Sequence, residues 1–181
     1  MSIIVESYNP DWVKWYEDIK SRVWPNVSSD AIAIEHVGST SVKGLVAKPI
    51  IDIDIIAKDQ KRISSCINSL EKLGYKHRGN LGVEGREAFY NPEKVSHDHH
   101  LYVCLEGCDS LLNHLTLRDH LIRNSDDVSK YSKLKMDLAQ KYSHDIDAYI
   151  EGKTSFIIDV LSQYSFEKDS LIQINSVNQK K

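Results

Sequence analysis

The sequence has no strongly basic segment. Its 181 residues carry 23 Lys and Arg against 26 Asp and Glu, a formal net charge of -3. Charges of both signs are spread along the whole chain. Proteins that coat nucleic acids or anionic membranes depend on basic arms or patches. We therefore expect neither a nucleic-acid polymer nor a membrane as partner, whereas a small phosphorylated ligand or nucleotide is compatible with this pattern.

Cysteines, long apolar runs and targeting signals are also scarce. The three cysteines, Cys66, Cys104 and Cys108, cannot all pair within one chain and match no common zinc spacing. Small thiols are favoured over a metal site at Cys104 and Cys108. The most apolar window, 50–57, is interrupted by two aspartates and is too short to span a membrane. The first residues show no basic region followed by an apolar one, so we expect a reduced, cytoplasmic protein.

Apolar periodicity predicts the order of the elements. Trp12, Tyr16, Ile19 and Val23 recur at helical spacing after Asn9-Pro10, and this helix should end near Pro25. A second helix is predicted over 61–73, and three more between 109 and about 164, with breaks near 124–125 and 143. Strands are predicted over 31–37, 50–57, 75–77, 87–90 and 99–105.

This order predicts an α+β protein with a mixed β-sheet flanked by helices and with C-terminal helices. We expect one domain over residues 1–166, with its sheet core over about 31–105 and helices over about 109–165. The remaining residues, 167–181, are polar and are expected to form a flexible tail. Within that tail, residues 171–174 could add an edge strand.

Two aspartates lie in the strand predicted over 50–57. Because side chains alternate along a strand, Asp52 and Asp54 point to one face and the isoleucines between them to the other. Burying two ionised carboxylates side by side is costly unless a cation binds them. Mg²⁺ prefers one or two carboxylates together with substrate phosphates. The alternative is an open sheet face with two solvated aspartates.

A loop rich in glycine and hydroxyl side chains precedes the acidic strand. Gly38, Ser39 and Thr40 directly follow the strand predicted over 31–37. Glycine lets the backbone approach a ligand closely, and amide or hydroxyl groups bind phosphate oxygens. We therefore expect Gly38, Ser39 and Thr40 to bind phosphate beside the acids.

The block HVGSTSVKGLVAKPIIDIDI resembles the signature of the GrpB family, whose fold belongs to the nucleotidyltransferase superfamily. That superfamily has a Gly-Ser turn, about a dozen residues and then an acid-x-acid strand, and here 12 residues, 40–51, separate Ser39 from Asp52. The resemblance extends from about residue 8 to 165. Further residues that match the family are Gly85, Arg86, Phe89, His99, His100, Leu101, Leu117, Arg118, Asp119, Leu134, Lys135, Leu138, Ala139, Tyr149 and Lys153.

The resemblance implies that Asp52 and Asp54 are catalytic and hold Mg²⁺ or Mn²⁺. Active members of the superfamily usually add a third carboxylate on a later strand, but the matching segment here, HHLYVCL, contains no acid. His100 is the candidate third metal ligand, and an imidazole suits Mn²⁺ better than Mg²⁺. Acids near this strand, none clearly in register with Asp52 and Asp54, are Glu84, Glu87, Asp98 and Glu106.

Scattered cations complete the predicted pocket. Lys48, just before the acidic strand, and Arg86, after Gly85, are the favoured phosphate ligands. Arg118, Lys135 and Lys153 belong to predicted helices, where such side chains are more often solvated or paired. The run Gly152-Lys153-Thr154 is not a P-loop, because Asp147 occupies the position where that motif has glycine.

Three functions remain open. The first is a metal-dependent nucleotidyltransferase that moves a nucleotidyl group from a nucleoside triphosphate to a small acceptor. The second is a non-catalytic, regulatory module that binds a nucleotide or phosphate ligand and lost the third acid. The third, a purely structural protein, leaves the loop and the acids unexplained.

Overall fold

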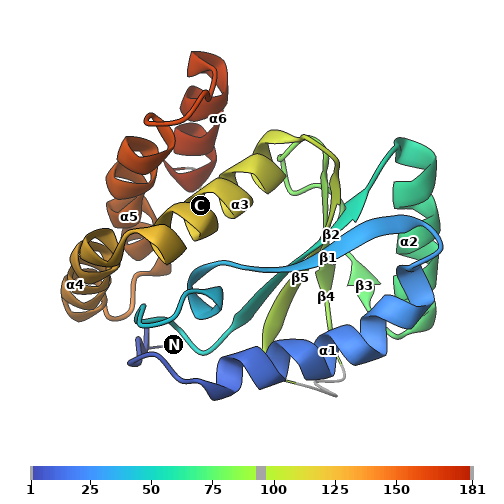
Figure 1. Cartoon of the computed structure of the whole chain (residues 1–181), viewed down its shortest axis with the longest axis horizontal. Helices are drawn as coiled ribbons and strands as arrows, with labels where there is room; N and C mark the ends of the chain where they lie inside the picture. Colours follow the sequence, from blue (N-terminus) through green and yellow to red (C-terminus); the bar gives the residue numbers. More distant parts are fainter. Residues whose placement is uncertain (1, 93–96, 180–181) are drawn as a thin grey trace.

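The fold is built on a mixed sheet, described here from a computed structural model that covers residues 2–92 and 97–179 (Figure 1). The sheet has the strand order β1-β2-β5-β4-β3. Strands β2 and β5 are parallel, and the other neighbours are antiparallel. The strands are β1 (Ala31–Val37), β2 (Ile51–Ala57), β3 (Lys76–His77), β4 (Arg86–Tyr90) and β5 (His99–Leu105).

Helices cover both faces of this sheet. On one face lie α1 (Asp11–Val27) and α2 (Gln60–Lys72), and on the other lies α3 (Asp109–Arg123) (Figure 1). Beyond α3, the chain adds α4 (Ser125–Lys141), α5 (Ile146–Leu161) and α6 (Lys168–Gln179), and a short 3₁₀ helix, η1 (Ser39–Ser41), follows β1. The predicted α+β class is therefore confirmed. Among the described residues, no helix has the length and apolarity that crossing a membrane requires.

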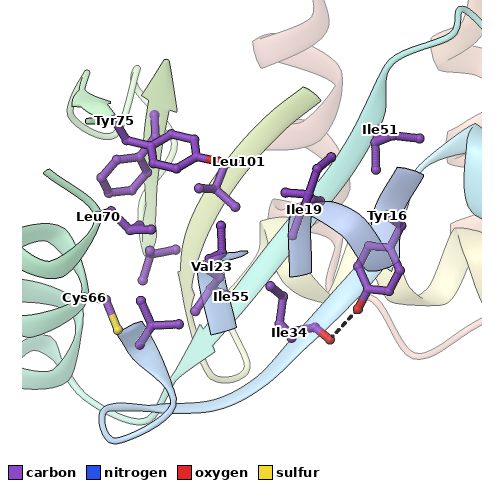
Figure 2. Close-up of a cluster of buried hydrophobic side chains, with 14 of the residues drawn as sticks. Tyr16, Ile19, Val23, Ile34, Ile51, Ile55, Cys66, Leu70, Tyr75 and Leu101 are labelled. Atoms are coloured by element: carbon purple, nitrogen blue, oxygen red, sulfur yellow. Dashed lines mark hydrogen bonds between the residues drawn. The ribbon is translucent and has the colours of Figure 1, made fainter. Parts of the chain in front are cut away.

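The main core lies between β2 and the two helices α1 and α2. Helix α1 buries Trp12, Tyr16, Ile19, Val23 and Val27, which recur every three or four residues and so form one stripe. Figure 2 shows part of this stripe against strand residues, with the Tyr16 hydroxyl donating a hydrogen bond of 2.9 Å to the Ile34 carbonyl oxygen. This packing uses one face of β2 and leaves the other for the acids.

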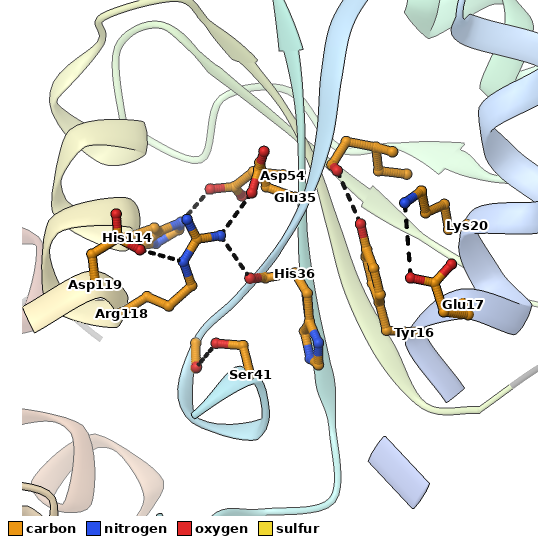
Figure 3. Close-up of polar contacts among 12 residues, drawn as sticks. Tyr16, Glu17, Lys20, Glu35, His36, Ser41, Asp54, His114, Arg118 and Asp119 are labelled. Atoms are coloured by element: carbon orange, nitrogen blue, oxygen red, sulfur yellow. Dashed lines mark hydrogen bonds and ion pairs between the residues drawn. The ribbon is translucent and has the colours of Figure 1, made fainter. Parts of the chain in front are cut away.

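Strand β2 separates apolar from acidic side chains as its alternation predicts. Ile51, Ile53 and Ile55 are buried in the main core. Asp54 belongs to the opposite face, where it contacts His114 of α3 (Figure 3), and Asp52, two residues earlier on the strand, shares that face. In the register with β5, Asp52 lies opposite His100 and Asp54 lies opposite Tyr102. The topology therefore brings the two acids beside the strand that was predicted to complete their site.

The last described residues are helical. Residues 168–179 form helix α6, which packs against α5, so residues 171–174 do not add an edge strand to the sheet. Ile174 is buried by this packing. A short apolar run fits either a helix or a strand, and here its tertiary contacts determine the outcome.

Candidate functional site

The turn after β1 lies directly against the acidic strand. Gly38 has φ +69° and ψ -169°, a conformation that side-chain-bearing residues essentially do not adopt. A Cβ atom at this position would lie 2.2 Å from Asp52 Oδ2. Only glycine therefore allows the turn and the Asp52 carboxylate to approach this closely. The structure thus brings Gly38 and Ser39 to the acids and rules out a solvated acid pair far from the turn.

Asp54 is fully buried and is held by helix α3. Its Oδ2 atom lies 2.7 Å from Nδ1 of His114, whose side chain is 25% exposed (Figure 3). Burial lowers the pKa of His114, but the charge and the hydrogen bond of Asp54 outweigh it and raise that pKa above its ordinary value. The other oxygen, Asp54 Oδ1, is buried and has no hydrogen-bond partner among the residues that the structure describes. An orphaned carboxylate oxygen of this kind is a ready ligand for a cation.

Asp52 pairs with the candidate third ligand. Its Oδ1 atom lies 2.8 Å from Nδ1 of His100. Burial would raise the pKa of Asp52, but the hydrogen bond and charge of His100, with positive charge on His114 and Lys153, hold it below its usual value. Among the described residues, no group of three or more His, Cys, Asp or Glu side chains is arranged to hold a metal ion.

A buried lysine reaches the same turn from helix α4. Lys135 is only 2% exposed, and its Nζ donates a hydrogen bond of 2.7 Å to Ser39 Oγ and another to the Val46 carbonyl oxygen. Desolvation lowers the pKa of Lys135 well below its ordinary value, and repulsion from Lys153 and Lys48 lowers it further. One lysine therefore binds the turn predicted to bind phosphate, and two more lie near enough to this lysine to affect its pKa.

The other predicted phosphate ligands are placed unequally. The Arg86 guanidinium stacks 4.6 Å from the centroid of the Tyr102 ring, on the strand beside the acids. Lys48 is half-buried and close enough to Lys135 to affect its pKa. The Thr40 side chain instead turns inward, where its Oγ1 contacts Nε2 of His36 at 3.0 Å and the Ile50 carbonyl oxygen at 3.4 Å. Thr40 thus supports the shape of the turn.

Arg118 fastens helix α3 to strand β1. Its Nη1 atom donates to Glu35 Oε2 at 2.7 Å and to the His36 carbonyl oxygen at 3.0 Å, and its Nε atom bonds to Asp119 at 2.8 Å (Figure 3). Arg118 is thus paired with acidic side chains, as expected for a cation on a predicted helix. These contacts hold the helix that carries His114 against the sheet.

Sequence reasoning missed His114. It lies four residues before Arg118, so both side chains belong to one face of helix α3. That spacing, once Arg118 is recognised, would have directed attention to His114. The residue lines a small cavity of about 50 Å³ beside Gly38 and Ser39 and also a cavity of about 390 Å³ that includes Arg86. His114 therefore lies between the turn at Gly38 and Ser39 and the predicted phosphate ligand Arg86.

These features define a class: an α+β protein with a paired-acid strand held against a Gly-Ser turn. The family model described as "GrpB protein" matches residues 2–163, nearly the whole chain. The chain therefore belongs to the GrpB family.

Known proteins agree with this assignment. The chain is 33% identical to "UPF0157 protein BH1888" of Halalkalibacterium halodurans over 164 residues, which is 90% of this chain and 82% of that protein. It is 31% identical to "UPF0157 protein YqkA" of Bacillus subtilis, covering 83% of this chain but only 43% of that longer protein. A crystal structure of the "conserved protein GrpB from Enterococcus faecalis" superposes with a TM-score of 0.77 at 31% identity, covering 94% of this chain and 98% of that one.

Proposed function

We propose that this protein binds a nucleoside triphosphate with a divalent cation and transfers its nucleotidyl group to a small acceptor. One observation carries the proposal: an orphaned, buried carboxylate oxygen belongs to the strand that packs against the glycine turn, and a buried lysine binds the same turn. Within the described part of the chain Asp54 Oδ1 has no hydrogen-bond partner, and Lys135 is buried close to two further lysines. A metal–polyphosphate complex supplies the cation for the first and the anion for the second.

Two carboxylates suit Mg²⁺ or Mn²⁺ where phosphate oxygens supply the further ligands, because the described side chains form no group of three that could hold the ion alone. Asp52 and Asp54 would hold the ion, and His100, now paired with Asp52, would have to turn towards the ion to add an imidazole, which favours Mn²⁺. When bound, the ion neutralises phosphate charge and polarises the phosphate that is attacked. Two carboxylates are as many as Mg²⁺ commonly takes from a protein when phosphates provide further ligands.

The chain's own residues would position the phosphates. The backbone of Gly38 and the Ser39 hydroxyl face them, and Lys135 and Arg86 neutralise their charge. The acceptor hydroxyl oxygen attacks the α-phosphorus, the bond from that phosphorus to the bridging oxygen breaks, and pyrophosphate leaves. The hydroxyl proton passes to solvent. Most of the acceleration would come from positioning and charge neutralisation.

A second function is favoured by a specific feature of strand β5. The residues opposite Asp52 and Asp54 are His100 and Tyr102, so this strand offers no third carboxylate. Binding of a nucleotide or phosphate ligand without turnover, as in a regulatory module, is compatible with this arrangement.

The test is calorimetric titration of ATP, GTP, CTP and UTP with and without Mg²⁺ or Mn²⁺. We expect metal-dependent binding of at least one nucleotide that Asp54→Asn weakens by at least tenfold, while Asp137→Asn, an exposed change on helix α4, leaves it intact. Lys135→Met should likewise weaken nucleotide binding, and Lys133→Met, which changes an exposed lysine on the same helix, should leave it intact. Absence of nucleotide binding to the wild type overturns the nucleotidyltransferase and the nucleotide-binding module alike. Binding without pyrophosphate release, over a broad set of hydroxyl acceptors, favours the regulatory module.

A further inference from the structure

A serine and a lysine form a close pair at the turn after β1. Lys135 Nζ lies 2.7 Å from Ser39 Oγ, although the two residues are 96 positions apart in the sequence. Ser39 begins the short helix η1 directly after Gly38, so the glycine turn fixes the position of this hydroxyl group. Pairs of this composition occur in enzymes in which a lysine is the general base for a serine nucleophile.

The surroundings of Lys135 disfavour a positive charge on it. Its side chain is only 2% exposed, and besides Ser39 its Nζ contacts the Val46 carbonyl oxygen. Within the described part of the chain, no Asp or Glu side chain forms an ion pair with Lys135. A buried ammonium group without a carboxylate partner is costly, and such a group loses its proton instead.

Groups on other elements also act on this amine. Desolvation lowers the pKa of Lys135 most, and repulsion from Lys153 on α5 and from Lys48 before β2 lowers it further. Asp52 on β2 and the face of the Tyr131 ring, whose centroid is 5.3 Å from Nζ, favour the ammonium form. The lowering effects dominate, in agreement with the burial and the missing ion pair.

A neutral amine changes what the 2.7 Å contact can do. It has two N–H groups and one lone pair, so it can donate to the Val46 carbonyl oxygen while it accepts the hydroxyl proton of Ser39. A general base needs this arrangement towards its nucleophile. Ser41 lacks it, because its hydroxyl donates a hydrogen bond of 2.6 Å to the Gly38 carbonyl oxygen (Figure 3).

A small cavity adjoins Ser39. This residue is half-buried and lines the cavity of about 50 Å³, whose apolar wall comes from Leu117, Leu121 and Tyr131. Since a water molecule occupies about 30 Å³ in the liquid, this space suits a group of one or two carbons and not an aromatic ring. Arg118 also lines the cavity, where positive charge would stabilise the oxygen anion that forms when a carbonyl group is attacked.

We propose that Ser39 is a nucleophile that takes a short acyl group from an activated ester, with Lys135 as its general base. The Ser39 oxygen attacks the carbonyl carbon while its proton passes to Lys135 Nζ. The bond from that carbon to the leaving oxygen breaks, and the leaving group takes the proton from Lys135 and departs as an alcohol. Water then attacks the acyl-serine ester, which releases the carboxylic acid and restores the serine.

The net reaction is ester hydrolysis. It needs neither a nucleotide nor a metal ion, and neither Asp52 nor Asp54 takes part in it. Its test is therefore independent of the test of the proposed function, and either can fail without the other.

The experiment uses the full chain with p-nitrophenyl acetate at pH 8, with EDTA and without nucleotide, and follows the acetylation of single residues by peptide mass spectrometry. We expect an acetyl group on Ser39 and none on Ser41. Lys135→Met should slow the acetylation of Ser39 by about a hundredfold, whereas Lys133→Met, a change of an exposed lysine on the same helix, should leave it unchanged. An unmodified Ser39, equal acetylation of Ser41, or an unchanged rate in Lys135→Met overturns the proposal.

A second measurement does not depend on any variant folding. The initial rate of Ser39 acetylation in the wild type should change little between pH 7 and 9, because the amine of Lys135 is already neutral there. A lysine with the ordinary pKa of 10.5 would let this rate rise about tenfold per pH unit, and that result overturns the proposal. The benzoate ester should acylate Ser39 at least tenfold more slowly than the acetate, and equal rates overturn the preference for a short acyl group.

Discussion

Gly38→Ala tests whether the glycine turn and the acidic strand depend on each other. Gly38 has φ +69° and ψ -169°, and placing a side chain in that region costs about 1–3 kcal/mol. The added Cβ atom would also lie 2.2 Å from Asp52 Oδ2 and 2.8 Å from its Cγ. Because these contacts are impossible, the turn or the Asp52 side chain must move.

The second cost comes from the Asp52 contact with His100. The two side chains are 31% and 50% exposed, so loss of their 2.8 Å pair costs only about 0.5–1 kcal/mol. The two costs together predict a loss of about 1.5–4 kcal/mol in the free energy of unfolding. Gly44→Ala is the matched control, because Gly44 has φ +86° and its added Cβ would meet nothing within 4 Å. It should lose about 1 kcal/mol.

Equilibrium urea denaturation of the wild type and both variants measures these losses. If nucleotide binding is found, Gly38→Ala should weaken it at least tenfold, whereas Gly44→Ala should leave it unchanged. Equal destabilisation of the two variants would refute the reasoning, because the clash with Asp52 would then contribute nothing.

Three further predictions concern buried polar groups. Burial lowers the pKa of His36 to about 4, so on acidification the unfolded chain binds this proton before the folded protein does. Up to about 3 kcal/mol of stability is therefore lost as pH falls from 6.5 to 4. His36→Phe should remove this part of the pH dependence of the free energy of unfolding in urea, and an unchanged pH dependence would contradict the prediction. Lys135→Met should raise the free energy of unfolding at pH 7 by about 1–2 kcal/mol, because folding no longer desolvates an amino group whose pKa burial lowers; a lower free energy of unfolding in urea would instead show that its hydrogen bonds to Ser39 and Val46 dominate. Tyr16→Phe removes the hydrogen bond to the Ile34 carbonyl oxygen and should lower the free energy of unfolding in urea by about 1–2 kcal/mol. An unchanged free energy of unfolding would contradict this prediction.

Most secondary structure was predictable because apolar spacing reports local geometry. The predicted bounds of the strands over 31–37 and 99–105 are those of β1 and β5 in the structure. The predicted bounds of β2 and of helices α1 to α5 differ from the observed ones by a few residues. Helix α6 was not predicted. Its polar residues have no strong period, and it forms in packing contact with α5, which local sequence does not report.

The candidate site was predictable where motif and alternation coincide. Asp52 and Asp54 share a face because they are two residues apart on a strand, and the Gly-Ser motif identified the turn. Lys135 was recognised among the helical cations but placed behind Lys48 and Arg86. His114 was not singled out, because its contact with Asp54 spans 60 residues.

The sequence by itself determines the alternation that directs two carboxylates to one face of a strand, and the glycine that permits a backbone conformation closed to other residues. These are local properties, set by the chain's geometry within a few residues. The partners of those groups depend on the assembled fold. Helices α3 and α4 bring His114 and Lys135 to β2 and to the turn, where burial changes the pKa of each by an amount that only the surrounding charges set.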